Sequence, residues 1–232
     1  IIRRYLQSAQ GNITALYHQT NRGLLRTLNE TLALVDSDFV AYMAADDWME
    51  PARFSRQLAE FEIKGPACAL VHSDMFRADE DGNRLEGTHW ALKGRSTGDI
   101  FLDSVERCAI GTPSALIRSN ALRAVGGYDE SLMYEDFDMW LQLSRRFAIS
   151  YIDTPLVTYR EVATSMSNSW DVWQSHLSRL NSLLKHLDLA GEHGSAVQRR
   201  ASELIRALYL HGREPSQTAS DILRVVGARK SA

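Results

Sequence analysis

The sequence predicts an α/β protein in which strands and helices alternate and the C-terminal part is helical. Apolar runs rich in β-branched and aromatic residues, such as 39–44 and 68–72, are separated by segments of about a dozen residues with helical apolar spacing. This alternation is typical of βα units and favours a mostly parallel sheet. The stretch 38–48 also ends in two adjacent carboxylates, and open α/β sheets bind ligands beyond the carboxyl ends of their strands.

Composition limits the class of protein. A hydrophobic content of 44% and a charged content of 24% over 232 residues are typical of a globular protein with one large core. The formal net charge of -3 argues against nucleic acid as the main partner. Cys68 and Cys108 lack metal-ligand spacing and indicate free thiols, so we expect a reducing, cytoplasmic setting.

Elements in the first half of the chain follow from periodicity and from turn residues. Helices are expected over residues 1–9, 24–35 and 51–61, and strands over 13–18, 39–44 and 68–72. Asn21 can N-cap the second helix, because its side chain accepts a backbone N–H. Pro51 suits a first helical position, where φ is preset and no N–H is needed. The acidic stretch 79–83 predicts a turn.

The second half continues the pattern. It predicts a loop at 88–95, a short helix at 99–105, a turn and strand at 109–118, a helix that stops at Gly126, a helix from Asp136, and strands at 148–152 and 156–159. Trp90 lies in the first of these loops, and such loops often cover binding sites.

The C-terminal stretch has a different character. Trp170, Trp173, Leu177, Leu180, Leu184 and Leu187 recur at steps of three and four, as in an a/d seam. The seam is short for a free coiled coil, which favours packing back on the domain, while a homodimer through these helices is the alternative. Two further helical stretches, 197–210 and 220–226, are mildly basic. They indicate either a solvated polar face or peripheral contact with anionic lipid.

Asp46 and Asp47 have two interpretations. Carboxylates at the end of a strand suit a hard divalent cation, and such a cation often carries substrate phosphates. Acidic residues are also common at helix starts, so the pair could instead cap the helix that follows.

A second acidic cluster, Glu135, Asp136 and Asp138, stands at the start of a predicted helix. Asp136 heads the apolar stripe Met139, Trp140, Leu143 and Phe147, whereas Glu135 and Asp138 align with Gln142 and Arg145 on a polar face. A carboxylate on the inward stripe suits a pocket, where it could accept a proton from an attacking hydroxyl. The alternative is that Asp136 only caps backbone N–H groups.

Five short motifs in order resemble the family 2 glycosyltransferases. They are Asn21-x-Gly23 with Asn29, Ala45-Asp46-Asp47 before Pro51, Gly126-Gly127-Tyr128-Asp129-Glu130, Glu135-Asp136, and Tyr159-Arg160. The resemblance covers about residues 1–165 and implies a GT-A fold, a Rossmann-like mixed sheet flanked by helices that is common to nucleotide-diphospho-sugar transferases. Residues 166–232 are then a helical C-terminal extension.

The resemblance implies inverting transfer of a sugar from a nucleotide-diphosphate donor to an acceptor hydroxyl, with Mn2+ or Mg2+. Carried onto this chain, the resemblance implies that Asp46 binds the metal and that the donor is bound by Asp47, Asn21 and Gly23. It implies that Asp136 is the base, with Glu135 beside it. The residues expected near the acceptor are Gly111, Thr112, Pro113 and Trp90. The acceptor is expected to be a glycan or a lipid-linked molecule. The family most often implies cell-surface polysaccharide synthesis, which places the protein at the inner face of the membrane.

Three departures from the family pattern favour an alternative. The family's first strand and its acidic turn would precede Ile1, so we expect an N-terminally truncated domain with weak activity by itself. Ala44 stands where many members have Asp, and Val162 where many have His. The alternative is a non-catalytic GT-A-like domain that binds a nucleotide or a glycan.

Overall fold

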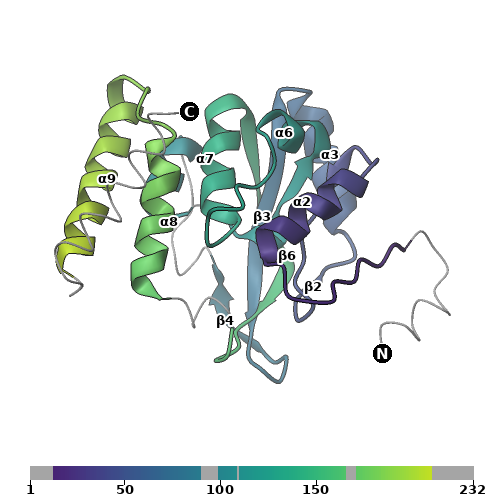
Figure 1. Cartoon of the computed structure of the whole chain (residues 1–232). Helices are drawn as coiled ribbons and strands as arrows, with labels where there is room; N and C mark the ends of the chain where they lie inside the picture. The colour runs from purple at the N-terminus through teal and green to yellow at the C-terminus, as the bar shows by residue number, and fades with distance from the viewer. Residues whose placement is uncertain (1–12, 90–98, 109, 166–170, 211–232) are drawn as a thin grey trace.

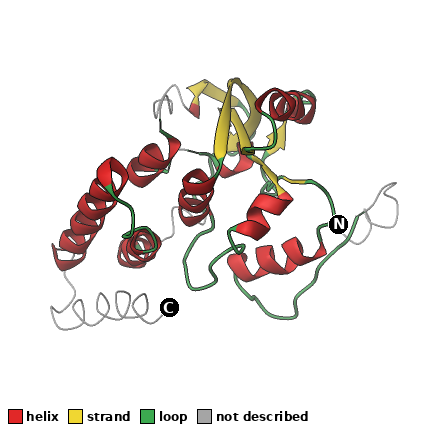
Figure 2. Ribbon diagram, turned by 90° about the horizontal axis from the view of Figure 1, so that it is seen from above, coloured by secondary structure: helices red, strands yellow, loops and turns green. Residues whose placement is uncertain are grey.

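The chain forms a central sheet with helices on both of its sides. A computed structural model describes residues 13–89, 99–108, 110–165 and 171–210. In Figure 1 the helices α7, α8 and α9 lie side by side next to the sheet, and the view from above shows helices on both sides of it (Figure 2). The expected helices at 1–9 and 220–226, together with Trp90 and Trp170, lie outside the described residues.

The sheet is mixed. Its strands are β1 (Phe39–Val40), β2 (Trp48–Met49), β3 (Cys68–Ala78), β4 (Arg84–Thr88), β5 (Leu116–Arg118) and β6 (Ala148–Arg160), in the order β1-β5-β3-β6-β2 with β4 beside β3. Among the described strands only β3 and β6 pair in parallel, so the expectation of a mostly parallel sheet was wrong. The tight turn at 79–83 can join only antiparallel strands, which accounts for the β3–β4 hairpin.

The two central strands are longer than their apolar patterns predicted. The expected strand 68–72 continues to Ala78, because the polar residues His72, Ser73 and Asp74 are also buried. The two expected strands after residue 147 are one strand, β6, which pairs with β3 along its whole length. A register shift near Asp74 accommodates Pro155 within it.

Seven α-helices are described, together with the short 3-10 helix η1 (Thr112–Ser114). They are α2 (Leu24–Leu34), α3 (Arg53–Lys64), α5 (Ile100–Arg107), α6 (Ser119–Ala124), α7 (Asp136–Arg146), α8 (Val172–Leu184) and α9 (Gly191–Leu210). Asn21 is not the N-cap of α2, because Gly23 occupies that position without a side-chain cap. Asn21 Oδ1 accepts the Gly23 N–H at 2.9 Å and so shapes the turn before the helix.

Two expected strands did not form as predicted. Residues 13–18 are not a strand, and Ile13, Leu16 and Tyr17 are each about half exposed. Among the described residues no strand lies beside them, and a strand without a partner leaves its backbone groups unpaired. The strand expected at 39–44 ends at Val40, and the chain continues as an irregular segment to Asp46.

The core consists of apolar layers on both sides of the sheet. Val71 and Leu116 face Phe61 of α3, whereas Leu70 and Ile117 face α6 and α7, as side-chain alternation along a strand requires. A further cluster joins α5, α7, α8 and α9 and contains the seam residues Trp173, Leu177, Leu180 and Leu184. The expectation that this seam packs back on the domain is therefore confirmed. No helix among the described residues is both long and apolar enough to cross a membrane.

The two adjacent glycines that follow α6 lead to a stability prediction. Gly126 and Gly127 both have positive φ, at 93° and 74°. A Cβ on Gly127 would lie 2.8 Å from Asn29 Oδ1, whereas one on Gly126 would meet nothing within 4 Å. Both Gly→Ala variants should lose about 1 kcal/mol from backbone strain. Gly127→Ala should lose at least about 1 kcal/mol more, because Asn29 must move.

Chemical denaturation of the two variants measures this difference directly. Equal free energies of unfolding for Gly126→Ala and Gly127→Ala would show that Asn29 does not restrain the loop.

Candidate active site

An open cleft of about 510 Å³ lies between the acidic turn at Asp46, η1, the start of α7 and α8. It gathers most of the residues that the sequence singled out, namely Asp46, Asp47, Gly111, Thr112, Pro113, Glu135 and Asp136. Asn21 and Gly23 are not in its lining, although the next residue, Leu24, is. Trp90 lies outside the described residues, and its neighbour His89 lines the cleft.

The end of β6 holds the acidic turn in place. The Arg160 N–H donates to Asp47 Oδ1 at 3.0 Å, and Arg160 Nε donates to the Asp46 carbonyl at 3.0 Å. The same guanidinium donates to the Glu80 carbonyl at 2.8 Å and lies over the Trp48 ring. Since β2 separates the turn from α3, whose N-cap is Ala52, the two acids do not cap that helix.

Asp47 combines burial with an unused acceptor. Its Oδ2 is buried and has no hydrogen-bond partner among the described residues. Burial raises the pKa of Asp47 to about 6, the nearby Asp46 charge adds to the rise, and the Arg160 N–H opposes it. An unpaired carboxylate oxygen beside the exposed carboxylate of Asp46 fits a hard divalent cation.

The two acids cannot form a closed metal cage by themselves. No group of three or more His, Cys, Asp or Glu side chains suited to a metal occurs in the described part of the chain. A magnesium-like ion commonly takes only one or two protein carboxylates and completes its shell with phosphate and water. The acidic turn therefore fits Mn2+ or Mg2+ only together with a phosphate ligand.

Asp136 is the first residue of α7 and faces the cleft. Its Oδ1 accepts the Phe137 N–H at 2.6 Å, and its Oδ2 accepts from the Cys108 thiol at 3.4 Å. Asp136 thus accepts one backbone N–H at the start of α7 and also lines the cleft.

Both acids of this pair hold protons more tightly than ordinary carboxylates. Burial raises the pKa of Glu135 to about 7, and the neighbouring Asp136 charge adds to the rise. Burial also raises the pKa of Asp136, although the Phe137 N–H, the Cys108 thiol and the Arg179 charge oppose the rise. A carboxylate whose pKa is raised above its ordinary value is better suited to act as a general base.

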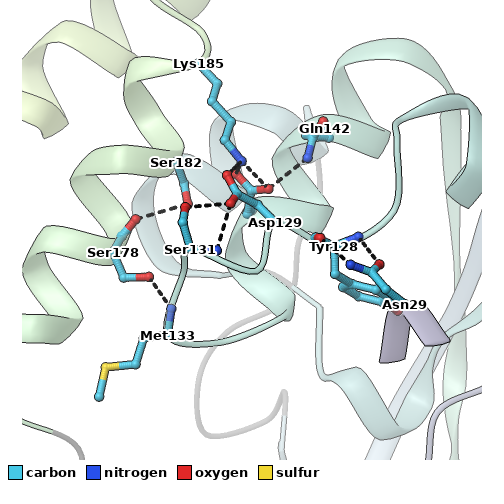
Figure 3. Close-up of polar contacts among 10 residues, drawn as sticks. Asn29, Tyr128, Asp129, Ser131, Met133, Gln142, Ser178, Ser182 and Lys185 are labelled. Atoms are coloured by element: carbon cyan, nitrogen blue, oxygen red, sulfur yellow. Dashed lines mark hydrogen bonds and ion pairs between the residues drawn. The ribbon is translucent and has the colours of Figure 1, made fainter. Parts of the chain in front are cut away.

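An ion pair from α8 fixes the start of α7 (Figure 3). Lys185 Nζ lies 2.8 Å from an Asp129 oxygen and 2.7 Å from an Asp138 oxygen, and Gln142 Nε2 donates to Asp138 at 2.8 Å. Asp138 was predicted on a polar face, but its side chain is 4% exposed. The prediction was wrong because helical periodicity does not reveal that α8 covers this face and supplies a cation.

The segment before the acid pair is held from two sides (Figure 3). On one side Asn29 of α2 exchanges two hydrogen bonds of 2.8 Å with the backbone of Tyr128. On the other side the Met133 N–H donates to Ser178 Oγ at 3.0 Å, and Tyr134 Oη donates to the Ser175 carbonyl at 2.9 Å. The contacts of residues 128–134 with α2 and α8 therefore position Glu135 and Asp136.

The opposite wall of the cleft is held by α3. Gln57 Nε2 donates to the Ser114 carbonyl at 2.8 Å, and Arg53 Nη2 donates to the Ala115 carbonyl at 3.1 Å. Both side chains are buried, so they fix the end of η1. This contact places Gly111, Thr112 and Pro113 beside the cleft.

Three charged or polar residues that line the cleft were not predicted from the sequence. Arg179 of α8, Arg107 of α5 and Tyr42 all face the cleft. Arg179 stands beside the predicted seam, between Leu177 and Leu180, and nothing in the local pattern marks it as a site residue. The available signal was the seam itself, because a helix that packs back on the domain can bring its flanking residues to the site.

Comparisons with known proteins identify a family, relatives and structures with a similar fold. A family model described as Glycosyl transferase family 2 matches residues 1–125. An uncharacterized glycosyltransferase of Haemophilus influenzae is 28% identical over 123 residues, which are 53% of this chain and 44% of that protein. The putative glycosyltransferase EpsE of Bacillus subtilis is 28% identical over an alignment of 152 residues, and the match covers 61% of this chain and 50% of EpsE. The chain thus spans about half the length of these curated relatives.

Solved structures share the fold. The chain is similar to S. aureus TarS 1–349 in complex with UDP-GlcNAc, with a TM-score of 0.62 and 13% identity over 98% of this chain and 66% of that one. It is also similar to the Pyrobaculum calidifontis mannosyltransferase PcManGT in complex with GDP-Man and Mn2+, with a TM-score of 0.55 and 14% identity over 99% of this chain and 66% of that one. These matches confirm the expected GT-A fold with its mixed sheet and flanking helices.

The ion pair of Lys185 leads to a stability prediction. Lys185→Met leaves the buried Asp138 charge without its cation and should cost about 3 kcal/mol or more in the free energy of unfolding. Arg145→Met is the matched control, because Arg145 pairs with Asp188, whose side chain is 63% exposed, and should cost less than about 1 kcal/mol. Adding Asp138→Asn to Lys185→Met should recover part of the loss. Urea denaturation measures all three variants, and equal costs for the two single variants would contradict the buried role.

The raised pKa of Glu135 leads to a pH prediction. Between its ordinary value of 4.5 and its folded value of about 7, the folded chain binds more protons than the unfolded chain. Glu135 should therefore lower wild-type stability as pH rises through this window, and Glu135→Gln should lack this part of the pH dependence. The advantage of the variant should reach on the order of 2 kcal/mol above the window.

Urea denaturation at pH values below, within and above this window tests the expectation. Glu86→Gln, at an exposed position, should keep the wild-type profile. A constant difference between Glu135→Gln and wild type at every pH would mean that the pKa of Glu135 is not raised.

Proposed function

Because the chain belongs to glycosyltransferase family 2, we propose that it transfers a sugar from a nucleotide-diphosphate donor to an acceptor hydroxyl, with inversion at the anomeric carbon. One observation carries this proposal. A single cleft is lined by the acidic turn at Asp46 and Asp47 and by the acid pair at Glu135 and Asp136. The first pair suits the diphosphate of a donor, and the second suits the nucleophile.

On the donor side, Asp46 and Asp47 are the residues that would hold Mn2+ or Mg2+. When bound, the ion neutralises the charge that develops on the diphosphate leaving group. The similar mannosyltransferase PcManGT was solved with GDP-Man and Mn2+. Arg160 keeps the acidic turn fixed, because it bonds Asp47 through its N–H and Asp46 through its guanidinium. Asn21 and Gly23 support this side by shaping the turn before Leu24.

On the acceptor side, Asp136 takes the proton of the acceptor hydroxyl as that oxygen attacks the anomeric carbon. The Phe137 N–H and the Cys108 thiol orient its two oxygens. Burial raises the pKa of Asp136, which favours proton uptake by its carboxylate, and Glu135 lies beside it in the cleft. Attack from this side, opposite the diphosphate, inverts the configuration at the sugar carbon. Gly111, Thr112 and Pro113 form the wall against which the acceptor lies.

The setting follows from the same proposal. The acceptor is a glycan or a lipid-linked molecule, and the protein acts in the cytoplasm at the inner face of the membrane, in cell-surface polysaccharide synthesis. Residues 1–165 supply the transferase domain, and residues 166–232 are its helical extension. Helix α8 of that extension reaches the cleft through Arg179.

Asp136→Asn tests the assignment of the base. The amide cannot accept the acceptor proton, so kcat should fall on the order of 10²- to 10⁴-fold, while affinity for the donor stays unchanged. Radiolabel transfer measures kcat, with UDP-GlcNAc and GDP-Man as first donors, and calorimetry with Mn2+ measures donor binding. Asp36→Asn, at an exposed position outside the cleft, is the control.

Two outcomes would contradict the proposal in different ways. Near-normal turnover of Asp136→Asn would exclude Asp136 as the base. Metal-dependent nucleotide binding by the wild type without transfer or donor hydrolysis would favour the alternative, a non-catalytic nucleotide-binding domain, which the Ala44 position motivates.

A further inference from the structure

Arg179 places a cation in the cleft from a helix far along the chain. It lines the cleft together with Glu135 and Asp136. Its Nε donates to Tyr134 Oη at 3.1 Å, and its guanidinium carbon lies 5.3 Å from the centre of the Phe137 ring. Both contacts come from residues that flank the acid pair, so the position of Arg179 is coupled to that pair.

The guanidinium of Arg179 has N–H donors that the described residues do not use. Among the described residues neither of its Nη atoms makes a hydrogen bond or an ion pair. Arg160, another arginine of the cleft, differs in this respect, because its guanidinium already bonds the carbonyls of Asp46 and Glu80. Arg160 therefore serves the structure, whereas Arg179 has free donors facing the cleft.

Asp136 attracts Arg179 through the cleft but makes no direct contact with its guanidinium. Its oxygens already accept the Phe137 N–H and the Cys108 thiol, and Arg179 makes no ion pair with it. Arg107, which directly precedes Cys108, also lines the cleft and adds positive charge there. It also pairs with Asp103 of the same helix, at 3.7 Å. The base side of the cleft is thus a cationic pocket as well as an acidic one.

We propose that Arg179 binds an anionic group of the acceptor, a phosphate or a carboxylate close to the hydroxyl that is attacked. The proposal deepens the proposed function and depends on it for the term acceptor. A guanidinium that is held by its Nε and lies over an aromatic ring presents its remaining N–H groups as a fork, which matches two oxygens of a phosphate or carboxylate. A cleft of about 510 Å³ has room for a sugar ring with such a group.

The fixed position of Arg179 should make the cleft prefer acceptors by their charge. The Arg179 side chain is fixed at Tyr134 and Phe137, so little conformational entropy is lost when an anion binds. An uncharged acceptor would leave the guanidinium in the cleft without a partner. Neutral acceptors should therefore bind more weakly than anionic acceptors of the same skeleton.

Two matched pairs of probes test the proposal on the full chain. Glycerol 1-phosphate against glycerol and glucuronate against glucose differ in the anionic group, and NMR titration measures their dissociation constants. Wild type should prefer the anionic member of at least one pair. Arg179→Gln should weaken its binding at least about tenfold, with no effect on the neutral member. The pair that shows the preference distinguishes a phosphate from a carboxylate.

Two variants complete the experiment. Arg206→Gln removes the same charge from an exposed position of α9 and should bind every probe as wild type does. Arg179→Lys keeps the charge but loses the fork, so it should retain part of the preference even if Arg179→Gln folds poorly. No preference for anions in wild type, or equal losses for charged and neutral probes in Arg179→Gln, would overturn the proposal.

The transfer assay separates this proposal from the proposed function. Anion selectivity that depends on Arg179 without any sugar transfer would contradict only the proposed function. Normal transfer with an Arg179→Gln variant that binds anionic probes as wild type does would contradict only the anionic acceptor.

Discussion

Lys185, the C-cap of α8, lies between the carboxylates of Asp129 and Asp138, and the arrangement of the cleft depends on this contact. Burying such charges costs much of the free energy that their attraction returns, so the contact is better understood as a positioning device than as a source of stability. It fixes the loop before α7 at one end and the first turn of α7 at the other. Glu135 and Asp136 are therefore held against α8, which also brings Arg179 into the cleft.

Partial burial sets the chemistry of the site. It raises the pKa of Asp47 to about 6 and that of Glu135 to about 7, both with a like charge nearby. A partly buried carboxylate is stabilised when a cation or a proton binds to it. The acidic turn at Asp46 and Asp47 therefore suits a metal with its diphosphate, and the pair Glu135 and Asp136 suits a proton. The same desolvation strengthens the attraction between Arg179 and an anionic ligand.

Local patterns predicted the start of α7 at Asp136, the glycine stop at Gly126 and the acidic turn at Asp46. Each of these depends on neighbours in sequence. Pairing across the chain was not accessible in the same way. The sheet was expected to be mostly parallel, residues 13–18 were expected to be a strand, and Asp138 was expected on a polar face. These expectations were wrong because strand partners, and the helix α8 that covers Asp138, come from distant parts of the sequence. Arg179 was missed for the same reason.

The proposed function requires that a donor diphosphate and its metal bind at the acidic turn of this cleft. Paramagnetic broadening of backbone NMR signals by Mn2+ tests it most directly, in the presence of UDP or GDP. We expect nucleotide-dependent broadening around Asp46, Asp47 and Arg160, little effect on α9, and loss of the broadening in Asp46→Asn. Broadening that leaves the acidic turn unaffected, or that persists unchanged in Asp46→Asn, would contradict it.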